Sequence, residues 1–204
     1  MSPRMAMEER REIVLRESIP VFARYGYEGA TTAEIAKRAG VTQPYIFKLF
    51  DSKKALFIEA CERNMRTTER QMRDSAGGKT GLEAMAAMGQ AYFARMEDDR
   101  DSLLLQMQQY AACHDEDVQN TVRECMQSIW NAVVEISGQP VEEIAVFIAK
   151  GMLCNVLAAA GRNGSADPQW EPVLRALWPD KYEDGGGNEG GDQDPPAGAV
   201  VPAA

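Results

Sequence analysis

Apolar residues recur three or four positions apart along most of the chain, which is the spacing of one face of an α-helix. No stretch alternates apolar and polar residues for long enough to predict a β-strand. Glycine, proline and paired acidic residues interrupt the helical pattern and mark its boundaries. Residues 1–7 precede the pattern and are expected to be disordered. The pattern predicts an all-α fold, with helices over residues 8–25, 31–40, 42–49, 51–75, 79–97, 101–114, 116–137 and 141–161 and a short last helix between 167 and 178.

The second and third predicted helices are short and lie in one segment, TTAEIAKRAGVTQPYIFKLFDSKK, which begins at Thr31. Thr31 and Glu34 have the spacing of a capping box, which predicts the start of a helix. Gly40 suits the left-handed backbone of a tight turn between helices, and Thr42 is placed to cap the helix that follows. Two short helices joined in this way form a helix-turn-helix.

The outward side of the second short helix carries groups that suit a DNA groove. Hydroxyl and amide groups can read base edges, an aromatic ring can make apolar contacts, and a lysine can bind phosphate. On the motif alone, a helical hairpin with no DNA-binding role remains the alternative. The outward residues are Thr42, Gln43, Pro44, Tyr45, Phe47 and Lys48.

The segment resembles the DNA-binding domain of the tetracycline-repressor (TetR) family of bacterial regulators, whose pattern is roughly T-T-x-x-I-A-x-x-A-G-V-S-x-G-x-L-Y-x-H-F-x-S-K. The chain departs from it at Pro44, Phe47 and Leu49, where the family usually has glycine, tyrosine and histidine. The usual tyrosine and histidine contact phosphates, so Tyr45 is the candidate to supply a hydroxyl here. At the places of the pattern the chain has Thr31, Thr32, Ile35, Ala36, Ala39, Gly40, Val41, Thr42, Ile46, Phe47, Phe50, Ser52 and Lys53. The candidate DNA-binding residues are Thr31, Thr32, Thr42, Gln43, Pro44, Tyr45, Phe47, Lys48 and Lys53.

The resemblance implies an N-terminal three-helix DNA-binding domain, over residues 1–52, and a helical ligand-binding and dimerisation domain, over residues 53–182. It implies a homodimer that binds an inverted-repeat operator on double-stranded DNA, most often a repressor that a small apolar effector releases. Control by a protein partner instead of a small molecule is the alternative. The composition after Pro179 is rich in glycine, proline and acidic residues, which predicts a disordered acidic tail over residues 183–204.

Net charge is distributed unevenly along the chain. Residues 1–54 hold ten Lys/Arg against seven Asp/Glu, whereas the remaining 150 residues carry most of the acidic excess behind the overall charge of −9. The basic part coincides with the helix-turn-helix, as DNA binding requires, although its excess is small enough to arise by chance.

The helical body of the chain contains many methionines among its apolar residues. Methionine fills irregular gaps and adapts to varied shapes, so the plain interpretation is an ordinary core. Together with aromatic residues, the methionines also suit an apolar cavity with a few polar groups, and the resemblance implies such a cavity between the fourth and seventh helices. The candidate ligand-binding residues are Met85, Met88, Tyr92, Met107, Tyr110, Met126 and Trp130.

The helix predicted over residues 141–161 is too apolar for one of its faces to be solvated. Small residues in it permit close helix approach, and in the TetR family the last two helices form a four-helix bundle across a two-fold axis. The alternative is a fully buried central helix of a monomer. The candidate dimer residues are Phe147, Gly151, Met152, Asn155, Ala158, Ala159 and Trp170.

Signatures of catalysis are missing from the sequence: we find no Walker loop, GxSxG, HExxH or dinucleotide fingerprint, and we expect a protein that is not an enzyme. The only histidine, His114, adjoins Cys113, but neighbouring residues on a helix point in different directions. Four cysteines are widely spread without a CxxC pair, so neither a metal site nor a cofactor is expected.

The chain shows neither a signal peptide nor an apolar run of membrane-spanning length. We therefore expect a cytoplasmic protein with reduced, mostly buried thiols and no membrane partner. A redox-sensing role for one cysteine stays open.

Overall fold

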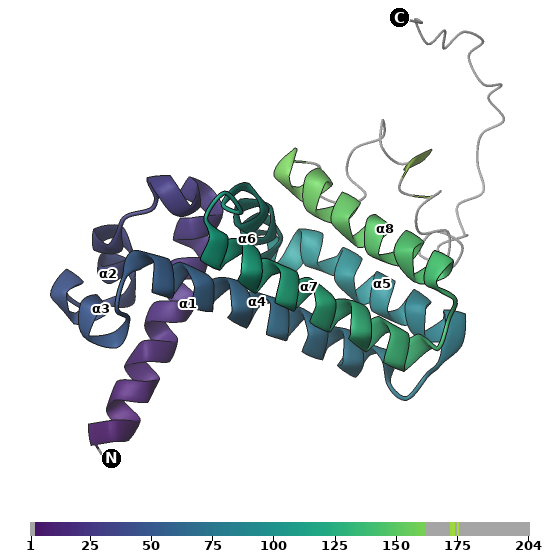
Figure 1. Cartoon of the computed structure of the whole chain (residues 1–204), viewed down its shortest axis with the longest axis horizontal. Helices are drawn as coiled ribbons and strands as arrows, with labels where there is room; N and C mark the ends of the chain where they lie inside the picture. The colour runs from purple at the N-terminus through teal and green to yellow at the C-terminus, as the bar shows by residue number, and fades with distance from the viewer. Residues whose placement is uncertain (1–2, 162–171, 174, 176–204) are drawn as a thin grey trace, which may run out of the picture.

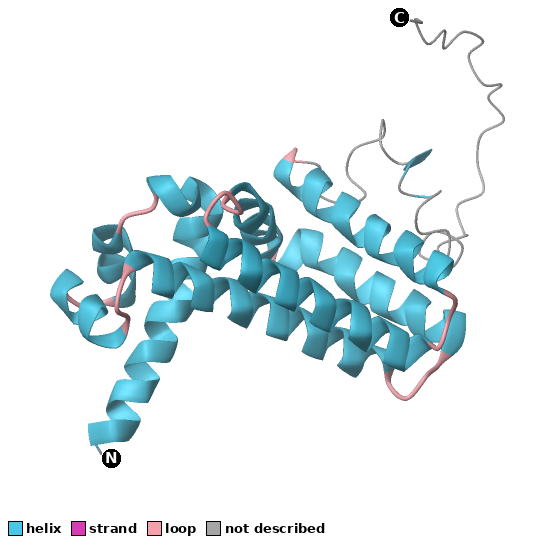
Figure 2. Ribbon diagram, viewed as in Figure 1, coloured by secondary structure: helices cyan, strands magenta, loops and turns pink. Residues whose placement is uncertain are grey.

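The computed structural model describes residues 3–161, 172–173 and 175, and all regular secondary structure in that part of the chain is helical (Figures 1 and 2). Trp170, the tail over residues 183–204 and most of the expected last helix lie outside the described residues. The helices are α1 (Pro3–Gly29), α2 (Thr32–Ala39), α3 (Gln43–Leu49), α4 (Lys53–Ala76), α5 (Gly81–Asp98), α6 (Arg100–Ala111), α7 (Glu116–Ser137) and α8 (Val141–Ala159).

The eight helices predicted over residues 8–161 are all present, and most of their boundaries fall within three residues of the prediction. The exception is α1, which begins at Pro3, so residues 3–7 are helical and their expected disorder is wrong. Proline is favoured at a first helical position, and the alanine and methionines after it are good helix formers. At its other end α1 breaks at Gly26, whose φ of 68° is left-handed, and a final turn continues to Gly29.

The first hydrophobic core joins α1, α2 and α3 to the first half of α4. Phe22 and Phe57 meet edge to face with ring centroids 4.9 Å apart, and both side chains are fully buried, as are Ile35 and Ile46. Each such side chain contributes roughly 1.5–3 kcal/mol through burial. This core holds the short α3 helix, whose seven residues would not be stable as a helix in water.

The second hydrophobic core lies at the other end of the molecule, among α5, α7, α8 and the second half of α4 (Figure 1). Met65 and Met72 of α4 belong to it, whereas Leu56 and Phe57 of the same helix belong to the first core. Helix α4 has 24 residues and is therefore about 36 Å long. The expected domain boundary between residues 52 and 53 falls just before α4. This helix packs in both cores, so it belongs to both domains.

Helix α6 is a second connection between the two halves, because it packs against α1. Leu105 of α6 and Ala112, just after its end, lie in the first core. Gln108 Nε2 donates a hydrogen bond to the carbonyl oxygen of Ala23, at 3.4 Å. At Gly26 a Cβ atom would lie only 2.7 Å from Gln108 Oε1, so this position needs glycine for both its backbone angle and its space.

None of the helices in the described part of the chain combines the length and the hydropathy that crossing a bilayer requires.

Candidate DNA-binding surface and regulatory cavity

The turn between α2 and α3 is built from the residues that the sequence singles out. Thr31 Oγ1 accepts a hydrogen bond from the Glu34 amide at 3.2 Å and caps α2. Gly40 ends α2 in the left-handed conformation, with φ of 65°. Thr42 occupies the N-cap position of α3, but its side chain makes no capping hydrogen bond, which corrects that part of the prediction.

Helix α3 presents one polar side to solvent and buries the other. Ile46 and Leu49 are buried in the first core, and Tyr45 is half-buried against it. The outward side is short, and its exposed members are Thr42, Gln43, Pro44, Phe47 and Lys48.

The side chain of Gln43 is held in place by α2. Its Nε2 donates to Thr32 Oγ1 at 2.8 Å, and Thr32 is 6% exposed. The bond fixes the direction of the amide at the start of α3 and commits one of its N–H donors, while Gln43 Oε1 makes no bond within the described structure. Thr32 therefore positions Gln43, and its own hydroxyl is largely covered.

The ammonium group of Lys53 has partners within the protein that could not be predicted from the sequence. Its Nζ donates to the carbonyl oxygens of Glu28, at 3.2 Å, and Ala30, at 3.3 Å, and lies 4.8 Å from the centre of the Tyr27 ring. Two carbonyl oxygens, one in the last turn of α1 and one just after it, thus supply negative partners to a lysine that opposes the α4 dipole. Its contact with DNA stays a prediction.

The neighbouring lysine also has a partner inside the protein. Lys54 Nζ lies 3.2 Å from an Asp115 carboxylate oxygen and 2.5 Å from one of Asp117, at the start of α7. These bonds raise the pKa of Lys54. The start of α4 is thereby fastened to the start of α7, and this cation too is engaged within the protein.

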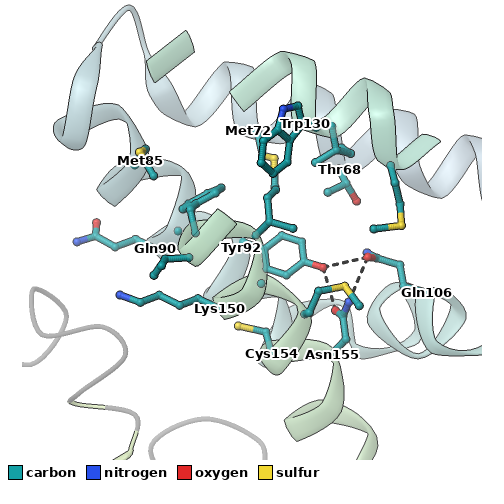
Figure 3. A pocket seen from close by; sticks show the side chains of 18 of the residues that line it. Thr68, Met72, Met85, Gln90, Tyr92, Gln106, Trp130, Lys150, Cys154 and Asn155 are labelled. Atoms are coloured by element: carbon teal, nitrogen blue, oxygen red, sulfur yellow. Dashed lines mark hydrogen bonds between the residues drawn. The ribbon is translucent and has the colours of Figure 1, made fainter. Parts of the chain in front are cut away.

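A cavity of about 290 Å³ lies at the other end of α4, among α4, α5, α6, α7 and α8 (Figure 3). Its wall is mostly apolar and includes methionines from four of these helices. The cavity was expected between the fourth and seventh helices, and in the structure α8 also forms part of its wall. Five of the candidate ligand-binding residues line it: Met85, Tyr92, Tyr110, Met126 and Trp130.

Two candidate ligand-binding residues do not line this cavity. Met88 is completely buried and borders a separate small void between α4 and α5. Met107 is half-buried on α6, where Gln106 and Tyr110, four residues apart, share the side that meets the cavity. Helical spacing identified the apolar sides of α5 and α6. It cannot show which residues of an apolar side line a cavity and which pack in the core.

Three polar side chains from α5, α6 and α8 meet at one wall of the cavity (Figure 3). The Tyr92 hydroxyl lies 3.1 Å from Gln106 Oε1 and 2.9 Å from Asn155 Oδ1, and Asn155 Nδ2 donates to Gln106 Oε1 at 3.2 Å. All three residues are buried. Burial raises the pKa of Tyr92 to about 12, so the phenol stays neutral at physiological pH.

The comparisons with known proteins bear directly on the helix-turn-helix. Residues 14–60, which span the end of α1, all of α2 and α3 and the start of α4, match the family described as bacterial regulatory proteins, tetR family. Residues 14–60 therefore carry the helix-turn-helix of the TetR family. The match covers the Thr31 cap, the Gly40 turn and the outward side of α3.

Curated relatives of this chain are transcriptional regulators. The regulator YerO of Bacillus subtilis (strain 168) is 29% identical over 102 residues, which make up 48% of this chain and 35% of that protein. The activator FasR of Mycolicibacterium smegmatis is 31% identical over 97 residues, which make up 47% of this chain and 44% of that protein. The chain thus matches less than half the length of these relatives.

Solved structures share the fold over more of the chain. The transcriptional regulator FadR of Bacillus subtilis, in complex with stearoyl-CoA, superposes with a TM-score of 0.66 at 16% identity. The superposition covers 81% of this chain and 96% of that one. At this identity the likeness establishes the arrangement of helices.

The fold places most of the candidate dimer residues inside the protomer. Four of them, Phe147, Gly151, Met152 and Asn155, line the cavity. Ala158 is completely buried and Ala159 is exposed. Because α8 is apolar on every side, its sequence could not distinguish the side facing the cavity from the side facing outward. The large exposed apolar residues of α8 are Val141, Val146 and Val156.

Several site residues escaped the sequence analysis of this chain. Lys37 is exposed on α2 and, like Lys48, has no ion pair among the described residues. Gln106 and Asn155 were missed as cavity residues because a polar residue on an apolar helix shows its role only through its partners. Lys150 could have been identified from the sequence, because it is a single lysine in the apolar run of α8.

We predict that Tyr92 contributes a pH-dependent part of the stability. The folded protein raises its pKa from 10 to about 12, so it holds the phenol proton more tightly than the unfolded chain does. The resulting contribution, roughly 2–3 kcal/mol, is complete below pH 10 and is lost as the pH rises to 12. Urea denaturation between pH 9 and pH 12 should show a smaller fall in the free energy of unfolding for Tyr92→Phe than for the parent.

Tyr25→Phe is the matched control, because Tyr25 is 50% exposed. It should keep the full pH dependence of the parent. Parallel curves for the parent and Tyr92→Phe would contradict the prediction.

Proposed function

We propose that this TetR-family protein regulates transcription by binding an operator, and that a small apolar molecule in the cavity lowers its affinity for DNA. The observation that carries the proposal is that α4 and α6 each contact both the helix-turn-helix domain and the cavity. A ligand that changes the cavity wall therefore acts on helices that also position α3.

The DNA-binding part of the proposal rests on the exposed side of α3. Gln43, held by Thr32, presents its amide to a base edge, Phe47 supplies an apolar contact, and Lys37 and Lys48 bind phosphate. The protein acts as a homodimer on an inverted repeat. Two α3 helices related by a dyad then enter successive major grooves, whose centres are roughly 34–36 Å apart.

The exposed apolar residues of α8 support the dimer. Val141, Val146 and Val156 are 57%, 54% and 47% exposed in the single chain, which is unusual for three valines on one helix. Contact with a second copy covers such a surface.

The ligand part of the proposal rests on the cavity. Its volume of about 290 Å³ lies at the low end for small-molecule sites, and its apolar wall suits a ring or part of an acyl chain. FadR of Bacillus subtilis, which shares the fold, binds stearoyl-CoA in its solved complex. We propose a ligand of the same apolar character here, and repression relieved by it as the direction of control.

Release of DNA requires the ligand to favour one conformation over another. Moving the population from almost fully DNA-competent to almost fully released takes about 10⁴-fold tighter binding to the released form. A shift of α6 acts on α1 through the contacts of Gln108 with Ala23 and Gly26. A shift of α4 acts on α3 through the first core. A small rotation of either helix alters the separation of the two α3 helices in the dimer.

The test is a footprint and a gel-shift titration on DNA from the promoter region of the protein's own gene. A protected region with two-fold symmetry supports the proposal. Protection without symmetry, or no preference over random DNA, would overturn it. Release of DNA by a protein extract and by no small molecule would favour the protein-partner alternative.

We predict different effects for two changes on α3. Gln43→Ala removes a base contact, so it should lower the preference for operator over random DNA by roughly 1–3 kcal/mol. Lys48→Ala removes a phosphate contact, so it should weaken binding to both DNAs equally and reduce the slope of log K against log salt by about one. Gel-shift titrations at several salt concentrations measure both effects.

Lys79→Ala is the control for charge, because Lys79 lies beyond the end of α4 and pairs with Glu83, far along the chain from the helix-turn-helix. It should leave affinity and salt slope unchanged. Equal behaviour of Gln43→Ala and Lys48→Ala would show that the two roles are wrongly assigned.

We predict that filling the cavity abolishes the response to ligand. Ala86 lines the cavity on α5, so Ala86→Phe should occupy the space that the ligand needs while the helix-turn-helix keeps its operator affinity. Ala94→Phe is the matched control, because Ala94 is exposed on the same helix. Gel shifts with and without ligand compare the two variants. A normal response in Ala86→Phe would place the ligand elsewhere.

A further inference from the structure

The polar cluster of Tyr92, Gln106 and Asn155 in the cavity wall contains one hydrogen-bond donor without a partner. Gln106 Oε1 accepts from Asn155 and lies in reach of the Tyr92 hydroxyl, so the oxygen of this amide faces its two neighbours. Gln106 Nε2 is buried and has no hydrogen-bond partner, although the residue is only 3% exposed. Buried amide groups in folded proteins are nearly always paired. An acceptor that enters the cavity is what this N–H₂ group lacks.

The surroundings of this donor are neutral. Tyr92 keeps its proton, because burial raises its pKa to about 12. The charged residues of the cavity lining are Glu143 and Lys150, both from α8. In Figure 3, Lys150 lies on the other side of Tyr92 from Gln106.

The buried arginine behind the wall is turned away from the cavity. Arg95 Nη1 donates to Thr68 Oγ1 at 2.7 Å, and its Nη2 pairs with Asp99 at 3.2 Å. Its Nε has no hydrogen-bond partner, but Arg95 does not line the cavity. An anionic group beside Gln106 would therefore lose its hydration and find no cation in return, which strongly disfavours it.

We propose that the cavity selects an uncharged molecule with an apolar body and one carbonyl-type oxygen, and that this oxygen accepts a hydrogen bond from Gln106 Nε2. Ketones, esters, thioesters and amides fall in this class, and free carboxylates do not. The inference rests on the proposed ligand-binding function of the cavity and adds the chemical class of the ligand. Gln106 thereby acts as the residue that determines specificity.

The test compares three compounds of similar shape by calorimetry on the full-length protein. Acetophenone carries the carbonyl oxygen, α-methylstyrene replaces that oxygen by a methylene group, and benzoate carries a charge. We expect acetophenone to bind about three- to tenfold tighter than α-methylstyrene, which is the effect of one neutral hydrogen bond. Benzoate should bind more weakly than acetophenone.

Two matched variants test the assignment to Gln106. Gln106→Leu should remove the preference for acetophenone over α-methylstyrene. Gln90→Leu makes the same change at an exposed position of the cavity lining and should keep the preference. NMR spectra of methyl-labelled methionine locate the binding, because Met85, Met126 and Met152 line this cavity and should shift with acetophenone.

Equal affinities of the unmodified protein for acetophenone and α-methylstyrene would overturn the proposal, whether or not Gln106→Leu folds. Benzoate binding as tightly as acetophenone, or no binding of acetophenone at millimolar concentration, would overturn it as well. Gel shifts score DNA release separately. A preference for the ketone without DNA release would refute the regulatory function and leave the ligand class standing, whereas release without that preference would refute only the ligand class.

Discussion

The fold depends on one helix that is packed into two cores. The first half of α4 is held by the aromatic contacts of Phe57 with Phe22 and Tyr27, and its second half by methionines around the cavity. A helix has a continuous backbone hydrogen-bond ladder, so displacement at one end carries to the other with little loss. The proposed control of DNA binding by the contents of the cavity rests on this constraint.

The middle of α4 carries a polar layer between the two cores. Asn64 Nδ2 donates to the carbonyl oxygen of Ser102 at 2.8 Å, and Thr68 receives the hydrogen bond of the buried Arg95. Polar groups in such positions must be paired, because an unpaired one is destabilising by roughly 1–3 kcal/mol. The layer therefore sets the register of α4 against α5 and α6, and helices held in register move as units. The cavity wall and the first core are linked through these fixed contacts.

Much of the architecture could be predicted from sequence because it follows from local rules. The Thr31 cap, the Gly40 turn and the Glu116–Ser137 helix each depend on residues close together in the chain, and each was predicted at its place. Features that depend on partners distant in sequence could not be predicted. Lys53 binds carbonyl groups more than twenty residues earlier, and no local signal reveals those partners. For α8, apolar residues all round the helix concealed which side faces the cavity.

The first core also includes residues from late in the chain, and this has a consequence for synthesis. Leu105 of α6, Ala112 just after its end, and Val118 and Val122 of α7 are buried in one core with α1 and the start of α4. When a chain emerges from the ribosome from its N-terminus, the helix-turn-helix lacks part of its core until residue 122 is available. A fragment interrupted before that point is left with exposed apolar surface and incomplete packing around α3. The first core is therefore completed only by the α6–α7 part of the chain, which also supplies part of the cavity wall.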